Sequence, residues 1–423
     1  MRKLAFLVLL LFCASFLFAE SGRDFASEVR LNMNSETLKQ VVTVRAFVDG
    51  DTTHFNVPTS VFPTGVVKAR YLGLNTPEST GKVEEYGKKA SRFTREKLEN
   101  ASSIIIESDD GHWNLDSSGG RVLVWVWYRT SESQPYRNLN IELLQNGLAN
   151  AYSTANNRYG TVAMAALNSA KENKLNLFSG QKDPDYYYGD AVELTLKELR
   201  CNVEQYDGIK VAFEGVITLN DGSSIYVEDY DPDSGLMYGI SVYYGYGLPG
   251  KALEILSVGN RSRIVGSVQY YENGGIYQIS GLTYKQMKPK DPGNVQKISG
   301  GHTGAYVLTD AKTFATGKVE LESGVFDYAY LALDTTVEMR GLKVASIKTD
   351  DNPNSSSKGA MTMHCVCDGT EVIVRTAVLT DQSRNIITQD EYLGKTVDVR
   401  GVVALHDGKY EIKVLSSKDI TIE

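Results

Sequence analysis

The sequence predicts a mainly β protein with some α-helix: a small β-barrel flanked by helices, followed by two further β-rich units. Stretches rich in β-branched and aromatic residues, bounded by glycine and other turn residues, recur along the chain and indicate strands. Helical patterns interleave with strands only in the first 180 residues. The length of 423 residues suits about three domains.

The elements of the first unit follow from the spacing of apolar residues. Residues 41–57 and 66–74 are largely β-branched and apolar, which predicts strands. Residues 84–101 predict a helix, because Ala90, Phe93 and Leu98 fall on one buried stripe. By the same criteria we expect further strands at 103–107 and 122–128, and further helices at 139–146 and 162–173.

The second and third units repeat one pattern. Residues 181–190, with Pro184 and three consecutive tyrosines, predict the boundary after the first unit. Residues 258–279 and 393–412 then each show a strand, a glycine bend, a strand, a tight turn and a strand, and residues 209–217 and 342–347 would begin the two units. Five short strands with a bent first strand suit an OB-fold. The predicted domains are therefore 38–180, an OB-fold-like domain at 190–288, a linker at 289–330 and a second OB-fold-like domain at 331–423.

The first 19 residues have the pattern of an export signal. Arg2 and Lys3 precede an apolar run over residues 4–18, and Ala19-Glu20 suits cleavage. The run is short for a membrane span, which needs about 20 residues, and no second such stretch follows. We expect an exported protein (secreted, periplasmic or at the cell surface) with no membrane span in the mature chain. A lipid anchor at Cys13 is the less favoured alternative, because a bulky phenylalanine precedes it.

Charge and cysteine content narrow the possible functions. Residues 20–180 hold 18 basic and 18 acidic residues, whereas residues 181–423 hold 24 basic and 34 acidic residues. The second part is therefore poorly suited to hold phosphate backbones by bulk charge. Its cysteines, Cys201, Cys365 and Cys367, are odd in number and do not form a disulfide framework. Core packing is favoured over a metal site for the last two, because no second ligand pair is visible.

Two acidic segments of the first unit are candidates for metal binding and base catalysis. Asp49-Gly50-Asp51-Thr52 places two carboxylates around a glycine at a strand turn, and crowded hard oxygens are what calcium or magnesium requires. Asp-Gly pairs are also ordinary turn residues, so this motif alone is weak. Asn75-Thr76-Pro77-Glu78 follows as a loop with an amide oxygen, a hydroxyl or carbonyl, and a carboxylate.

Two arginines complete a set suited to phosphodiester chemistry. Arg70 lies in an apolar strand, where a guanidinium needs a partner, and Arg121 opens another apolar strand. The simpler interpretation of Arg70 is a salt bridge at a sheet edge. In a phosphodiesterase, a metal and guanidinium groups would neutralise a pentacovalent phosphate while a carboxylate takes a proton from water.

These residues lie in motifs that resemble the staphylococcal nuclease (thermonuclease-like) family. The matching motifs, in the same order, are Asp49-Gly50-Asp51-Thr52, Arg70-Tyr71-Leu72-Gly73-Leu74-Asn75-Thr76-Pro77-Glu78, Glu85-Tyr86-Gly87-Lys88-Lys89-Ala90-Ser91, Gly120-Arg121, residues 138–149 and residues 170–179. The resemblance implies an OB-type five-stranded barrel with three helices. It also implies a Ca2+-dependent nuclease that cleaves DNA and RNA with little sequence preference and leaves 3′-phosphates.

The resemblance further implies a metal site with one departure from the family. Asp51 would ligate Ca2+ together with the carbonyl of Thr76, and Asp49 would lie close by. Asn75 stands where the family has a second metal-binding carboxylate. Because ligand charge sets calcium affinity, we expect weaker calcium binding with Asn75 as a neutral oxygen ligand.

The remaining roles also come from the resemblance. Glu78 would be the general base, and Arg70 and Arg121 would bind the scissile phosphate. Tyr152 would occupy the place of a nucleotide-stacking tyrosine. A Lys-Tyr pair that contacts a terminal phosphate in the family is replaced by residues 117–119, so end-directed cleavage is not implied.

The two OB-fold-like units contain no catalytic set. Their tyrosines could stack on bases, but alternating tyrosines are also common in strands. The units resemble OB-type domains of exported bacterial nucleases, which implies nucleic-acid or cell-surface binding. The alternative function for the whole chain is therefore a non-catalytic nucleic-acid-binding or cell-surface binding protein. Retention of Arg70, Glu78 and Arg121 favours the enzyme.

Overall fold

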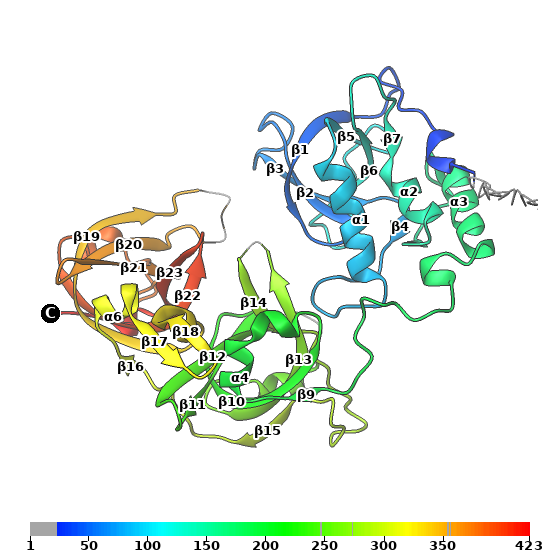
Figure 1. Ribbon diagram of the computed structural model, residues 1–423. Coiled ribbons are helices and arrows are strands. Elements are labelled where there is room, and N and C mark those ends of the chain that lie inside the picture. Colours follow the sequence, from blue (N-terminus) through cyan, green and yellow to red (C-terminus); the bar gives the residue numbers. More distant parts are fainter. Residues whose placement is uncertain (1–22, 246–247, 273, 353–354, 356) are drawn as a thin grey trace, which may run out of the picture.

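The computed structural model describes residues 23–423 except 246–247, 273, 353–354 and 356, and it consists of three barrels (Figure 1). The predicted export signal and Cys13 lie outside the described residues. Figure 1 shows the barrel of β1–β6 in blue and cyan, that of β10–β14 in green and that of β19–β23 in orange and red. No helix among the described residues is long and apolar enough to cross a membrane.

The first barrel is built from five strands in the order predicted. These strands are β1 (Lys39–Phe47), β2 (Thr52–Asn56), β3 (Val66–Tyr71), β5 (Ser103–Glu107) and β6 (Val122–Arg129). The sheet closes because β3 pairs in parallel with β6. The predicted strand 41–57 is two strands, because the turn that contains Asp49 and Asp51 separates β1 from β2. Trp125, Trp127, Tyr71 and Phe55 fill the core.

Helices and short pairings surround this barrel. The helices are α1 (Gly87–Glu99), α2 (Leu139–Gln145) and α3 (Gly160–Glu172), with the short turns η1 (Phe25–Ser27) and η2 (Asn176–Phe178). β7 (Arg137–Asn138) extends the sheet, and β4 (Leu74–Asn75) pairs with β8 (Asn150–Ala151). The first helix begins at Gly87, three residues later than the sequence predicts, because Tyr86 adopts the left-handed conformation (φ 65°).

The second barrel follows the same path. Its strands are β10 (Lys210–Asn220), β11 (Ser224–Asp231), β12 (Leu236–Tyr243), β13 (Arg261–Tyr271) and β14 (Ile276–Ser280), closed by the pairing of β10 with β13. Added to it are β9 (Val192–Glu193), β15 (Gln296–Ser299), α4 (Leu196–Cys201), α5 (Gly250–Ile255) and η3 (Val203–Tyr206).

The third barrel has the same strand connections as the second. Its strands are β19 (Thr336–Thr349), β20 (Met361–Cys367), β21 (Thr370–Thr376), β22 (Thr396–His406) and β23 (Lys409–Val414), closed by the pairing of β19 with β22. β16 (Val307–Leu308), β24 (Ile420–Ile422), η4 (Gln389–Glu391) and η5 (Ser417–Asp419) accompany it.

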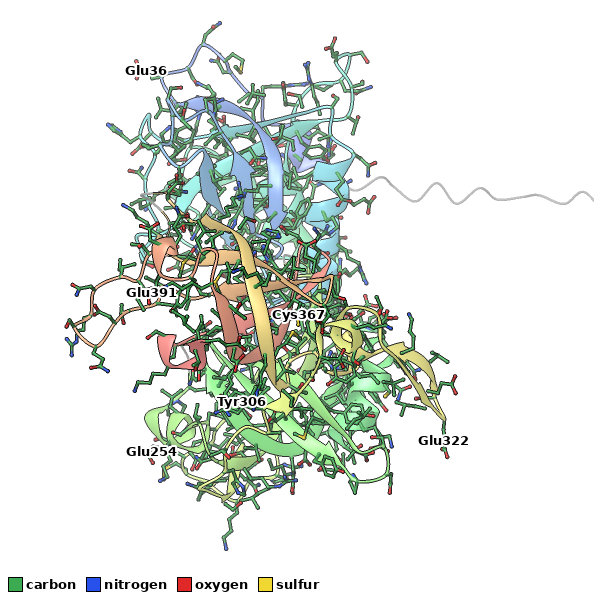
Figure 2. The ribbon with its side chains drawn as sticks, turned by 90° about the vertical axis from the view of Figure 1, so that its left-hand side faces the viewer. Glu36, Glu254, Tyr306, Glu322, Cys367 and Glu391 are labelled. Atoms are coloured by element: carbon green, nitrogen blue, oxygen red, sulfur yellow. The ribbon has the colours of Figure 1, made fainter. Side chains whose placement is uncertain are left out.

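The segment between the second and third barrels has structure of its own. Besides β15 and β16, residues 289–330 form α6 (Ala311–Thr316), the hairpin of β17 (Lys318–Leu321) and β18 (Gly324–Asp327), and most of α7 (Tyr328–Leu331). Figure 2 shows Glu322 at the outer tip of this hairpin. β15 pairs with β13 and β16 pairs with β19, so this segment lies along both barrels.

The three barrels share the OB-type path, which confirms the predicted fold class. In each one the third strand pairs in parallel with the fifth, and the fourth pairs with the first. The first strand of each breaks register at the same stage, between Val44 and Ala46, Ile217 and Leu219, and Val344 and Ser346. Such bulges bend a strand and let a short sheet close.

Candidate active site

A tight turn between β1 and β2 presents the two aspartates. The backbone N–H groups of Val48 and Asp49 both donate to the carbonyl of Thr52, at 3.1 and 3.3 Å. Thr94 of α1 donates its hydroxyl to the carbonyl of Gly50 at 2.6 Å. A Cβ on Gly50 would lie 2.9 Å from atoms of Ala90 and Thr76, so the turn packs closely against helix and loop. Both aspartates are therefore held in fixed positions.

Asp51 lies at the centre of the site and is fully buried. Its Oδ1 accepts from Arg70 Nη1 and, at 3.1 Å, from the Thr52 hydroxyl. Its Oδ2 accepts from the backbone N–H of Thr76 at 2.8 Å. Burial and the charge of Asp49 raise the pKa of Asp51 to about 8, against the opposing effect of Arg70. The guanidinium of Arg70 thus offsets only part of the effect that burial and Asp49 have on the pKa of Asp51.

Arg70 links the aspartate turn to the loop after β4. Its Nη1 donates to Asp51 and its Nη2 donates to Oδ1 of Asn75. The amide of Asn75 in turn donates to the carbonyl of Thr76 at 3.2 Å. The strand arginine therefore has a partner, as its apolar surroundings require, and this partner belongs to the candidate site.

Glu78 lies on the exposed loop that follows. The protein around its carboxyl group removes part of its water, and Asp49 adds a negative charge nearby; both raise the pKa of Glu78. Arg70 and Arg121 are close enough to oppose this shift electrostatically. Glu78 is therefore within electrostatic range of Asp49 and of both arginines.

Arg121 reaches the site from the start of β6. The parallel pairing of Ala69 with Val122 places Arg121 beside the strand that carries Arg70. Its guanidinium donates from Nε to Asp116 Oδ2 at 2.7 Å, and its side chain is 37% exposed. Asp116 was not among the residues that the sequence indicated. The pattern that could have indicated it as a partner of Arg121 is a carboxylate five residues earlier in a glycine-rich turn.

Tyr152 lies at the edge of the site. Its ring is 63% exposed, and its backbone N–H donates to the carbonyl of Gly73 at 3.2 Å. The preceding pairing of Asn75 with Asn150 places it beside the loop that carries Asn75. The exposed ring is thus available to stack on a flat ligand.

The donor atoms fit a calcium ion. Among the described residues, no group of three or more histidine, cysteine, aspartate or glutamate side chains is arranged to hold a metal ion. The oxygens here are instead of mixed type: the carboxylates of Asp51 and Asp49, the amide of Asn75 and the carbonyl of Thr76. Hard, mixed oxygens are what calcium takes. In the described part of the chain, the buried hydroxyl of Thr76 has no hydrogen-bond partner. Burial and the charge of Asp49 raise the pKa of Asp51, and a bound cation would favour its ionised form.

The first barrel and its helices are similar to known proteins. Residues 68–180 match the family model described as staphylococcal nuclease homologue. The chain contains a staphylococcal nuclease homologue domain. It is also similar to a protein named thermonuclease from Staphylococcus intermedius, with 30% identity over 115 residues. That match covers 26% of this chain and 62% of the relative's length.

The cysteines of the third barrel lie far from the first barrel in the sequence and belong to a core. Cys365 is fully buried on β20, and burial raises the pKa of its thiol to about 12. Cys201, Cys365 and Cys367 are free thiols. A thiol that stays protonated at neutral pH is a poor metal ligand, so the packing interpretation is favoured.

Proposed function

We propose that this protein is a calcium-dependent nuclease that hydrolyses phosphodiester bonds of DNA and RNA with little sequence preference and leaves 3′-phosphates. In this proposal the catalytic domain spans residues 38–180. The observation that carries it is the hydrogen-bonded network of Asp51, Arg70 and Asn75, with Glu78 within electrostatic range of both arginines. The family match and the thermonuclease relative support the same activity.

In the proposed reaction Glu78 takes a proton from a water molecule, whose oxygen attacks phosphorus. The P–O5′ bond breaks and the leaving O5′ takes up a proton from solvent, so a 3′-phosphate and a 5′-hydroxyl result. The raised pKa of Glu78 makes its carboxylate a stronger base than a fully solvated one. Arg70 and Arg121 stabilise the charge that builds on the phosphate oxygens.

Calcium would be held by Asp51, Asn75 and the carbonyl of Thr76, and when bound it neutralises negative charge on the phosphate. In this structure Arg70 pairs directly with Asp51. If a cation balanced that carboxylate instead, the guanidinium of Arg70 would be free to bind a phosphate.

The test is digestion of plasmid DNA and RNA by the full chain, with calcium or with a chelator of calcium. We expect cleavage only with calcium, and a loss of about 10²- to 10⁴-fold in rate for Glu78→Gln. Glu85→Gln is the matched control, because within the part of the chain that the structure describes this carboxylate accepts a hydrogen bond from Tyr188 and none from the residues of the candidate site. No calcium-dependent cleavage above the Glu78→Gln level would refute the enzyme.

The proposal includes export of the protein. It rests on the basic pair and apolar run of the first 19 residues. Mass spectrometry of the protein from cells and medium checks it: the mature form is expected to begin at Glu20, and a mature form that retains Met1 would contradict cleavage.

A further inference from the structure

We infer that the second barrel holds the loop that carries Glu78 in its working position, and that Gln269 is the positioning residue. This inference rests on the proposed function. The loop that carries Glu78 runs from Glu78 to Glu84, and hydrogen bonds join these two residues. Glu84 donates its backbone N–H to the carbonyl of Glu78 at 2.9 Å, and its carboxylate accepts the N–H of Glu78 at 3.2 Å. These bonds tie the two ends of the loop together. Ser79 to Lys82 lie between the ends and contact the second barrel.

This part of the loop is bound by two side chains of the second barrel. Gln269 Nε2 donates to the carbonyl of Ser79 at 2.7 Å, and Gln269 Oε1 accepts the backbone N–H of Gly81 at 3.2 Å. Ser280 Oγ lies 2.9 Å from the carbonyl of Gly81 and 2.7 Å from Gln269 Oε1, so its hydroxyl can donate to either. These contacts are to backbone atoms one and three residues after Glu78.

The β13–β14 hairpin is shaped for this contact. Gln269 and Ser280 lie on its two paired strands, are 7% and 0% exposed, and face the loop. A Cβ on Gly281 would lie 3.2 Å from the carbonyl of Gly81, so loop and hairpin are in close contact. A buried polar group that loses its hydrogen-bond partner destabilises the protein, so Gln269 and Ser280 favour this one arrangement of loop and hairpin.

Other contacts between the two barrels do not involve this loop. Lys88 pairs with Asp207 at 3.1 Å, and Arg95 pairs with Glu272. Both pairs join α1 to the second barrel and are partly exposed, and exposed ion pairs stabilise little. They nevertheless provide a control, because Glu272 lies on the same hairpin as Gln269.

Loss of the Gln269 contact is expected to change the rate of the reaction rather than substrate binding. Arg70 and Arg121, which would hold the phosphate, lie on or beside the strands β3 and β6, outside the loop. Glu78 acts on the attacking water, and a displacement of about 1 Å in such a group can cost about 100-fold in rate. A lower kcat with an unchanged KM is the signature of an interaction that matters only in the transition state.

The experiment uses the full chain with Gln269→Ala and Gln269→Glu; the second keeps the size of the side chain but lacks the Nε2 donor. We expect kcat on a DNA substrate with calcium to fall about 10- to 100-fold while KM stays within about twofold. Hydrogen exchange of residues 78–84 is expected to accelerate, because Gly81 loses its acceptor in the alanine variant. Glu272→Gln is expected to leave kcat and loop exchange unchanged.

The two readouts separate this inference from the proposed function. If the unmodified chain cleaves DNA and Gln269→Ala loosens the loop without lowering kcat, the positioning role is wrong and the nuclease stands. Unchanged exchange in residues 78–84 of Gln269→Ala would also overturn the inference. If the unmodified chain does not cleave, the proposed function fails, while faster loop exchange in the variant would still establish the hold on the loop.

Discussion

At the scale of single residues, the site depends on how one arginine is shared. Arg70 donates both to buried Asp51 and to Asn75, so the neutral amide stands beside a cation that already has a carboxylate partner. The sequence indicated which residues belong together, but the hydrogen bonds among them follow only from the turn and loop geometry. The neutral side chain at position 75 has a testable consequence for calcium.

Asn75→Asp is expected to tighten calcium binding, because it adds a charged oxygen to the ligand set. The calcium concentration that gives half-maximal cleavage should fall on the order of tenfold. Titration of the rate with calcium measures it, and Asn75→Ala, which removes the oxygen, should shift the same value upward. An unchanged calcium dependence in Asn75→Asp would exclude position 75 as a ligand.

At the scale of elements, the start of α1 packs against the loop that carries Glu78. A Cβ on Gly87, the first residue of the helix, would lie 2.1 Å from the carbonyl oxygen of Glu78. The sequence predicted a helix from residue 84, and the left-handed Tyr86 moves its start to the position where glycine is required. The absence of a side chain at 87 is thus part of what places Glu78.

Gly87→Ala is therefore expected to displace Glu78 and to strain the helix start. We expect a loss of about 1–3 kcal/mol in the free energy of unfolding, together with a lower rate of cleavage. Urea unfolding and the cleavage assay measure the two effects. Gly250→Ala is a matched control at the first residue of α5, where an added Cβ meets nothing within 4 Å; equal losses in both variants would refute the steric argument.

At the scale of the whole molecule, the second and third barrels are joined by buried charge. Arg200 of α4 and Asp334 are each 2% exposed and pair at 2.9 Å, and Arg200 also donates to the carbonyl of Gly239. Glu228 accepts the backbone N–H of Thr336 at 2.6 Å. Figure 2 shows Tyr306 in the same junction, where its N–H donates to the Thr336 hydroxyl at 2.9 Å. These contacts make the two barrels one unit.

Removal of only one member of the Arg200–Asp334 pair leaves the other charge buried and unpaired. Arg200→Met is expected to lower the free energy of unfolding by about 3–5 kcal/mol. The double variant Arg200→Met, Asp334→Asn should lose less, because no unpaired charge remains; asparagine suits the left-handed φ of 67° at this position. Urea unfolding measures both, and equal or larger loss in the double variant would contradict the argument.

The sequence by itself predicted the fold class, a series of small barrels, and it indicated which residues to consider for the candidate site. The local pattern was sufficient for the fold class, because alternating apolar residues indicate strands and glycines within them indicate bends. Gly266 and Gly401 are two such glycines, and a Cβ on either would lie 2.5 Å from the fifth strand of its barrel. Only the tertiary structure decided that Gln269 binds the loop after Glu78, across a sequence separation of 190 residues. The physical reason is that a polar residue on the outer face of a strand carries no signal of its partner. Its burial depends on how two separately folded barrels dock.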